Sequence, residues 1–209
     1  TKPGVDERIR QFVRNGGTFI TTFFSGYVDE NDLVIIGGYP GRLRDILGIW
    51  VEEIDALPKS SKNSFVYGGQ AYSAGMLCDI MHLEGAKSLA EYQKDFYAGT
   101  PVITCNSFGK GQAYYVGTRP EQAFYERLMQ EVCEEQGIRS VVGTPAVVEA
   151  TERSRGKEHY LFLLNHGEEA EKMPVPQACI DLLTSRAYGE KEPLELAAKG
   201  VAILKCMEK

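Results

Sequence analysis

The sequence has few histidines, an odd number of cysteines and no long apolar run. Its 209 residues contain three His and five Cys. They form no CxxC or CxxH motif, which argues against a zinc site or a disulfide framework. No apolar run approaches the ~18 residues of a transmembrane helix. No basic run exceeds a pair, and the net charge of −6 disfavours nucleic acid or an anionic membrane surface. We therefore expect no metal, no cofactor, no nucleic-acid partner and no membrane partner, in a cytoplasmic protein with reduced thiols.

The composition is that of a folded protein with two different halves. Hydrophobic residues make up 43% and charged residues 25%, both near the globular average. Helix and strand patterns alternate up to about residue 142, and only short strand candidates follow. We predict an α/β domain over residues 1–142 and an all-β domain of sandwich type over residues 143–209.

Hydrophobic periodicity predicts two longer helices, one that begins at Pro3 and stops at Asn15-Gly16-Gly17, and one over residues 120–136 that Gly137 ends. A shorter helix is expected at 42–47, before Gly48. The apolar faces of the two longer helices are formed by Val5, Ile9, Phe12 and Val13, and by Phe124, Leu128, Val132 and Cys133.

Strand patterns cover much of the remaining chain. The unbroken β-branched and aromatic run over residues 18–24 is typical of a strand covered on both faces. The glycines on either side of Lys110 predict a hairpin. Further strands are predicted at 49–57, 65–67, 76–83, 88–92, 102–104, 113–117, 147–150, 159–165, 172–175, 180–183, 193–196 and 201–205.

The connection over residues 25–41 is unusually long and apolar. It contains Leu33-Val34-Ile35-Ile36 between acidic residues and glycines. An apolar loop of this length usually lies against something, either the same chain or another.

No arrangement of residues forms a complete nucleophilic site. Ser73 and Cys105 are the nearest approaches to a nucleophile on a strained turn, but neither has the flanking glycine pair. His82-Leu83-Glu84 has the order in which a carboxylate orients the catalytic histidine of glutamine-hydrolysing amidotransferases. Because no activated cysteine accompanies the pair, we interpret His82 and Glu84 as structural.

The histidines of the second half and the glycine-rich stretches are interpreted in the same way. His159 and His166 have no third ligand at metal spacing. Residues 37–41 and 109–111 match neither a P-loop nor a dinucleotide fingerprint, so we expect loop and hairpin turns there.

Two groups of carboxylates could suggest a glycosidase pair. Asp29, Glu30 and Asp32 lie in the apolar loop, and Glu52-Glu53 lie in a predicted strand, where adjacent side chains point to opposite faces. We interpret both groups as solvated surface.

Six motifs in the first 119 residues form a distinctive set. They are GGTFITTFFSG at 16–26, DENDL at 29–33, GGYPG at 37–41, LGIWVEE at 47–53, DFYAGTP at 95–101 and FGKGQAYY at 108–115. Together they closely resemble the middle domain of β-galactosidases of glycoside hydrolase family 42. The β-rich tail, through residues 200–204, is similar to the small C-terminal domain of that family.

The resemblance implies a three-domain enzyme: a catalytic (β/α)8 barrel, then a flavodoxin-like, class I glutamine amidotransferase-like trimerisation domain, then a β-sandwich. This chain resembles only the last two, and we expect it to begin inside the middle domain. The family's two catalytic glutamates lie on the barrel, and no position here matches them, so no catalytic residue is expected. The implied function is non-catalytic homotrimer assembly through the α/β domain, beside the catalytic barrel of the same polypeptide. The implied reaction is the hydrolysis of terminal non-reducing β-D-galactose residues with retention.

Two other functions stay open. A stand-alone amidotransferase would use Cys78 or Cys105 with the His-Glu pair. A carbohydrate-binding module would need Tyr160, Phe162 and Tyr188 exposed together. Because Tyr160 and Phe162 share one face of a strand, we predict that they are buried in the sandwich core.

Overall fold

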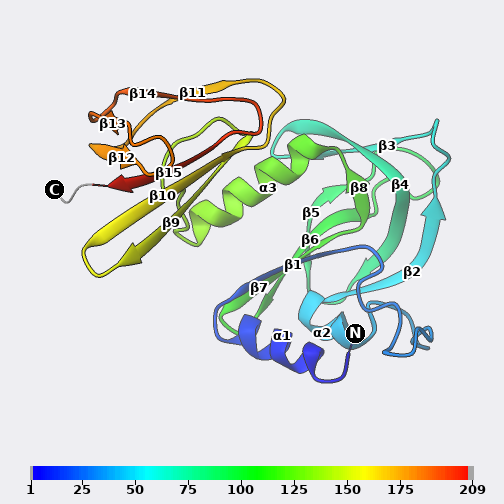
Figure 1. The fold of residues 1–209 in the computed structure, drawn as a ribbon. Helices are drawn as coiled ribbons and strands as arrows, with labels where there is room; N and C mark the ends of the chain where they lie inside the picture. Colours follow the sequence, from blue (N-terminus) through cyan, green and yellow to red (C-terminus); the bar gives the residue numbers. More distant parts are fainter. Residues whose placement is uncertain (1, 207–209) are drawn as a thin grey trace. The chain divides into compact units, whose positions relative to one another are not determined.

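The computed structural model describes residues 2–206, which form two compact units (Figure 1). The N-terminal unit is Thr1–Glu135 and the C-terminal unit is Gln136–Lys209. The first combines helices with sheets, whereas the described part of the second contains strands and no helix. The predicted order, an α/β domain followed by an all-β domain, is confirmed. The boundary near residue 142 stays a prediction.

A four-stranded mixed sheet forms the centre of the N-terminal unit. Its strand order is β1-β7-β6-β5, with bounds Thr18–Thr22, Gly111–Val116, Pro101–Phe108 and Lys87–Glu91. β1 runs parallel to β7, and the other two pairs are antiparallel. The β6–β7 pair is the predicted hairpin, in which Gly109 has a φ of 63°.

A second sheet of this unit is organised by one long strand. β4 (Gln70–Leu83) pairs with β3 (Asn63–Tyr67) along its first half and with β2 (Ile49–Ala56) along its second half. β8 (Thr118–Pro120) also pairs with β4. Two β-bulges interrupt the pairing: Glu52 is an extra residue in β2, and Met76 and Leu77 are extra residues in β4 opposite β8. Such bulges bend a strand and increase its twist.

The helices lie where periodicity predicts them. α1 is Val5–Arg14 and α3 is Gln122–Glu135. A short 3-10 turn and α2 (Arg44–Leu47) end at Gly48, whose φ is 61°. Phe12 departs from the predicted apolar face of α1, since it is 55% exposed. Only Val13 of α1 is fully buried, and the Phe12 ring lies over Gly17 instead of entering the core.

β7 separates two apolar cores in the N-terminal unit. Successive side chains of a strand point to opposite faces. Tyr114 and Val116 accordingly join the core beneath α3, while Ala113 and Tyr115 join the core that contains Val13 and α2. Every residue of β7 except Gln112 is buried.

β1 is the edge strand of the mixed sheet, and the predicted coverage of both its faces is only partial. Phe19 and Ile20 pack against opposite cores, so both faces of β1 make contacts. However, β7 is its sole partner among the described strands, and all five residues of β1 are only partly buried. The open outer edge accounts for the difference.

The C-terminal unit consists of antiparallel strands. A five-stranded sheet has the order β13-β12-β15-β10-β9, and β11 pairs with β14 in a second, two-stranded sheet. The bounds are β9 Val148–Arg155, β10 Glu158–Asn165, β11 Glu171–Pro174, β12 Cys179–Asp181, β13 Ala187–Tyr188, β14 Pro193–Leu196 and β15 Val201–Cys206. Both sheets contribute to one core, for example through Leu163 and Leu204 on one side and Met173 and Leu194 on the other. β13 was not predicted, because its two residues are too few to show a pattern.

Candidate functional site

The His82–Glu84 pair is not assembled as in an amidotransferase. His82 lies near the end of β4, where its Nε2 atom is 2.6 Å from Oε2 of Glu52 and its ring stacks on Trp50. Glu84 instead accepts hydrogen bonds from the guanidinium of Arg44. The two residues therefore have separate partners and both are exposed, which agrees with the structural interpretation.

Neither candidate cysteine has the environment of a nucleophile. Cys78 is fully buried beside Thr118, with Sγ 3.9 Å from Oγ1, and burial raises the pKa of its thiol. Cys105 is partly buried, its thiol faces Gln112 at 3.8 Å, and burial raises its pKa as well. A reactive cysteine needs a lowered pKa, because the thiolate is the attacking species. Both thiols suit packing better than catalysis.

Ser73 and the two histidines of the C-terminal unit have partners that favour a structural role. The amide and hydroxyl of Ser73 both donate to the Glu121 carboxylate at 3.2 Å. His159 and His166 each lie beside one glutamate, at 3.0 Å and 2.9 Å. Among residues 2–206, no group of three His, Cys, Asp or Glu side chains could hold a metal ion.

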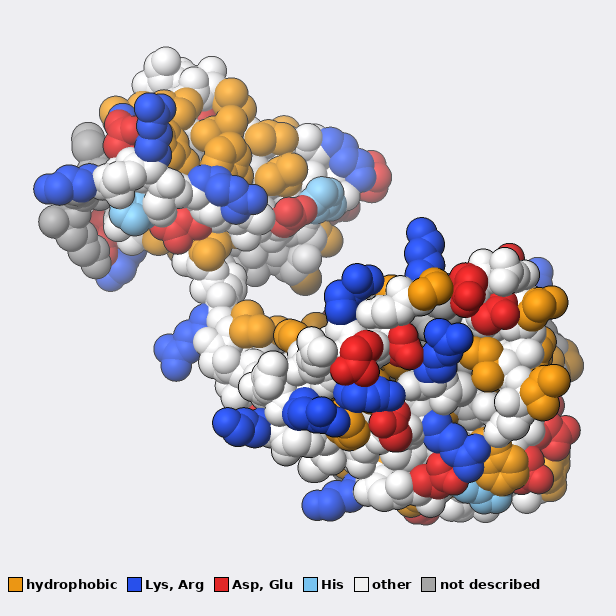
Figure 2. All heavy atoms as spheres, turned by 90° about the horizontal axis from the view of Figure 1, so that it is seen from below, with side chains coloured by type: hydrophobic (Ala, Val, Ile, Leu, Met, Phe, Trp, Pro, Cys, Tyr) orange, Lys and Arg blue, Asp and Glu red, His pale blue; other side chains and the backbone are white. Residues whose placement is uncertain are grey.

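The aromatic residues of the C-terminal unit do not form one exposed platform, and their predicted burial is partly wrong. Leu161 and Leu163 point into the core, so Tyr160 and Phe162 lie on the opposite face of β10 and are only partly buried. Tyr188, in contrast, is buried in the core. The sequence predicts that alternate residues of β10 share a face, but it does not tell which of the two faces meets the core. Hydrophobic side chains do gather on the face of this unit seen in Figure 2.

A buried carboxyl group that the sequence analysis missed lies in the N-terminal unit. Asp79 of β4 is fully buried and accepts a hydrogen bond from the Tyr115 hydroxyl at 2.7 Å. The Tyr115 hydroxyl is in turn 3.2 Å from that of Tyr39. Burial raises the pKa of Asp79 from 3.8 to about 6, and it also raises the pKa of both tyrosines. No sequence signal distinguishes this aspartate, because its partners come from distant segments.

The apolar loop between β1 and α2 is the most exposed hydrophobic feature of the N-terminal unit. Leu33 is 64% exposed, Val34 55% and Ile36 97%. Tyr39 anchors the base of the loop, because it is buried and its carbonyl accepts a hydrogen bond from the Val51 amide at 2.7 Å. Of the two predicted alternatives, contact with the same chain does not cover these three side chains, and contact with another chain stays a prediction.

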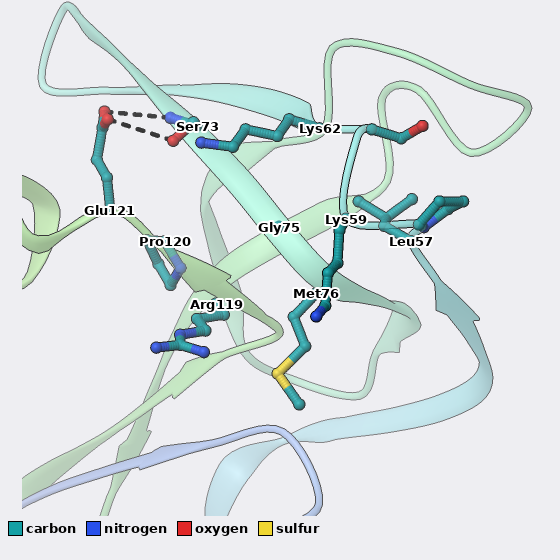
Figure 3. A pocket seen from close by; sticks show the side chains of 11 residues that line it. Leu57, Lys59, Lys62, Ser73, Gly75, Met76, Arg119, Pro120 and Glu121 are labelled. Atoms are coloured by element: carbon teal, nitrogen blue, oxygen red, sulfur yellow. Dashed lines mark hydrogen bonds between the residues drawn. The ribbon is translucent and has the colours of Figure 1, made fainter.

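A second surface feature is a pocket of about 400 Å³ beside the bulge of β4 (Figure 3). Its lining residues are Leu57, Pro58, Lys59, Ser61, Lys62, Ser73, Gly75, Met76, Arg119, Pro120 and Glu121. Its three basic residues are Lys59, Lys62 and Arg119. They come from two segments far apart in the sequence, so no local pattern predicts that they lie together. On the face of the N-terminal unit visible in Figure 2, basic, acidic and apolar side chains are interspersed.

The fold defines a class of protein in which an α/β unit is followed by an all-β unit. Within residues 2–206, no helix is long and apolar enough to cross a membrane. The features that distinguish the chain are an exposed apolar loop and a cationic pocket.

Two known protein families match this chain, one in each part. Residues 1–139 match the β-galactosidase trimerisation domain, and residues 147–205 match the β-galactosidase C-terminal domain. The chain therefore belongs to glycoside hydrolase family 42, of which it contains the trimerisation and C-terminal domains.

Individual relatives agree with this assignment. The β-galactosidase BgaP of Planococcus sp. is 46% identical over 210 residues, which cover 97% of this chain and 31% of the relative. The crystal structure of a β-galactosidase from Bacillus circulans sp. alkalophilus superposes with a TM-score of 0.88 at 47% identity, over 99% of this chain and 31% of that one. Gan42B, a family 42 β-galactosidase from G. stearothermophilus, superposes with a TM-score of 0.85 at 32% identity, over 98% of this chain and 30% of that one. The chain thus spans about a third of the length of these relatives.

Proposed function

We propose that this chain is the assembly region of a homotrimeric β-galactosidase, and that the trimer forms through the α/β unit. The observation that carries the proposal is the match of residues 1–139 to a trimerisation domain, together with the solvent-exposed apolar loop in the same unit. A monomer gains nothing from an isoleucine that is 97% exposed, whereas burial at a subunit interface would stabilise an assembly.

The chemistry of the whole protein is assigned to residues outside this chain. The names of the relatives support hydrolysis of β-galactosides, and the family resemblance supports retention through two carboxylates on a preceding barrel. The barrel of the same polypeptide would then be a neighbour of these two units. We place the protein in the cytoplasm, since its five cysteines are free thiols.

The finer fold assignment is part of the same proposal. The N-terminal unit is a flavodoxin-like, amidotransferase-like domain that ends near residue 142, supported by the order α1, β1 and the parallel β1–β7 pair. The C-terminal unit is a small β-sandwich, supported by a core to which its two sheets both contribute.

Light scattering on the full-length enzyme tests the assembly function. We expect the wild-type protein to have the mass of three chains. Placing lysines at Val34 and Ile36 should dissociate it, because positive charges would have to be buried at the interface. Met129→Lys is the matched control, since Met129 is 47% exposed on α3 of the same unit. A wild-type enzyme that is not trimeric refutes the function, and a folded double variant that stays trimeric refutes the loop contact.

A further inference from the structure

A closed trimer requires two different contact surfaces on each chain. Around a threefold axis each subunit presents one patch to its neighbour on one side and a different patch to the neighbour on the other side. The exposed loop supplies one such patch. The question is which other surface of the N-terminal unit complements it in charge and shape.

The pocket beside the β4 bulge has an excess of positive charge. Lys59, Lys62 and Arg119 line it, and their charged side-chain groups have no hydrogen-bond or ion-pair partner among residues 2–206. Its one carboxylate, that of Glu121, already accepts the amide and hydroxyl of Ser73 (Figure 3). The pocket is therefore locally positive in a chain whose net charge is −6.

The same pocket also has an apolar lining. Leu57, Pro58 and Pro120 line it together with Met76, whose side chain is 52% exposed. Met76 is one of the extra residues of the bulge and has a φ of 68°, a conformation that is uncommon for a residue other than glycine. The pocket therefore suits a ligand with carboxylates next to apolar side chains.

The exposed loop has this chemistry. Glu30 and Asp32 are exposed and precede the apolar residues Leu33 and Val34 directly. Oδ1 of Asp29 accepts the amides of Asn31 and Leu33 at 2.8 Å and 3.0 Å, so the turn is already shaped before it meets a partner. Preorganisation of this kind lowers the conformational entropy lost on binding.

The loop of one chain does not occupy its own pocket. Its base is fixed at Val51 in the first half of β2, whereas the pocket is lined by Leu57, just after that strand ends. Six residues of extended chain span about 20 Å. No residue of the loop contributes to the pocket lining, so the two surfaces are available to different neighbours.

We propose that the trimer is built head to tail, with the acidic and apolar loop Asp29–Ile36 of one copy seated in the cationic pocket of the next copy. The proposal rests on the proposed assembly function and names its two contact surfaces. The carboxylates of Glu30 and Asp32 pair with Lys59, Lys62 and Arg119, while the apolar residues of the loop cover Met76.

A charge-swap experiment on the full-length enzyme tests the proposal. The loop variant is Glu30→Lys with Asp32→Asn, which respects the positive φ of 60° at position 32. The pocket variant is Lys59→Glu with Lys62→Glu. By sedimentation velocity over a concentration series, each variant alone should weaken trimer formation by about tenfold or more. The combined variant should recover most of that loss, since opposite charges again face each other.

Control measurements separate this proposal from the assembly function itself. Lys110→Glu, on the β6–β7 hairpin, should leave trimer formation unchanged, and circular dichroism should show that every variant is folded. If the wild-type enzyme is trimeric but the loop and pocket variants are equally trimeric, the head-to-tail contact is wrong and the assembly function stands. A combined variant no better than the weaker single variant also overturns the contact. A wild-type enzyme that is not trimeric overturns both.

Discussion

Replacing the buried Asp79 by asparagine should change how the stability of the N-terminal unit depends on pH. Burial raises the pKa of Asp79 from 3.8 to about 6. Between these values the unfolded chain has lost the proton while the folded chain keeps it, so folding takes up a proton and stability falls as pH rises. A shift of about 2 units corresponds to about 3 kcal/mol, lost between pH 4 and pH 7 and constant above that.

The asparagine variant isolates this effect, because it removes the titration and keeps the shape. Its amide nitrogen would replace Oδ1, which has no hydrogen-bond partner in this structure, and an unsatisfied donor adds a cost of about 1–3 kcal/mol at every pH. The informative quantity is therefore the difference in free energy of unfolding between wild type and variant. We expect that difference to fall by about 3 kcal/mol as the pH rises from 4 to 7.

Urea unfolding followed by tryptophan fluorescence provides the assay. The single tryptophan, Trp50, lies in β2, so its signal reports on the N-terminal unit alone. Asp55→Asn is the matched control, because Asp55 also accepts a tyrosine hydroxyl at 2.7 Å, from Tyr97, but is only partly buried. A difference that stays flat with pH for Asp79→Asn, or one that rises, would refute the reasoning.

Two further substitutions test the packing of the N-terminal unit by the same urea assay. Gly48→Ala should destabilise it by about 1–3 kcal/mol, because φ is positive there and the new methyl group would lie 2.7 Å from Asn106, which caps α2. Gly99→Ala should destabilise the unit only through its positive φ of 85°, because no atom lies within 4 Å of the new methyl group. Phe124→Ala, at a fully buried site, should lose about 3–5 kcal/mol. Met129→Ala, on the exposed side of α3, should lose less than about 1 kcal/mol, and equal losses for the two helix variants would contradict the packing described.

Local patterns predicted the elements that depend on nearby residues. The α1 and α3 helices, the β6–β7 hairpin and most strands of the C-terminal unit follow from periodicity, glycine stops and β-branched runs, which act over a few residues. The family resemblance rested on contiguous motifs and was confirmed by the matches to residues 1–139 and 147–205.

What sequence reasoning missed depends on contacts between distant segments. Tyr160 was assigned to the wrong face of β10, because alternation gives the period of a strand but not which face meets the core. Asp79 and Arg119 acquire their roles from residues 36 and 43 or more positions away: Tyr115 for the first, and Lys59, Lys62 and Met76 for the second. The coverage of β1 was overestimated, since its outer edge has no neighbour among the described strands.

The extra residue Glu52 acquires an architectural meaning from the head-to-tail contact. β2 connects the base of the loop, at Val51, to the rim of the pocket, at Leu57, so in the proposed contact the twist of this strand would influence the angle between neighbouring subunits. That angle decides whether identical contacts close after three copies or continue as a filament. A bulge adds twist at one point of a strand. In the proposed contact, the extra residue Glu52 would therefore help to set how the loop and the pocket of one chain are oriented relative to each other.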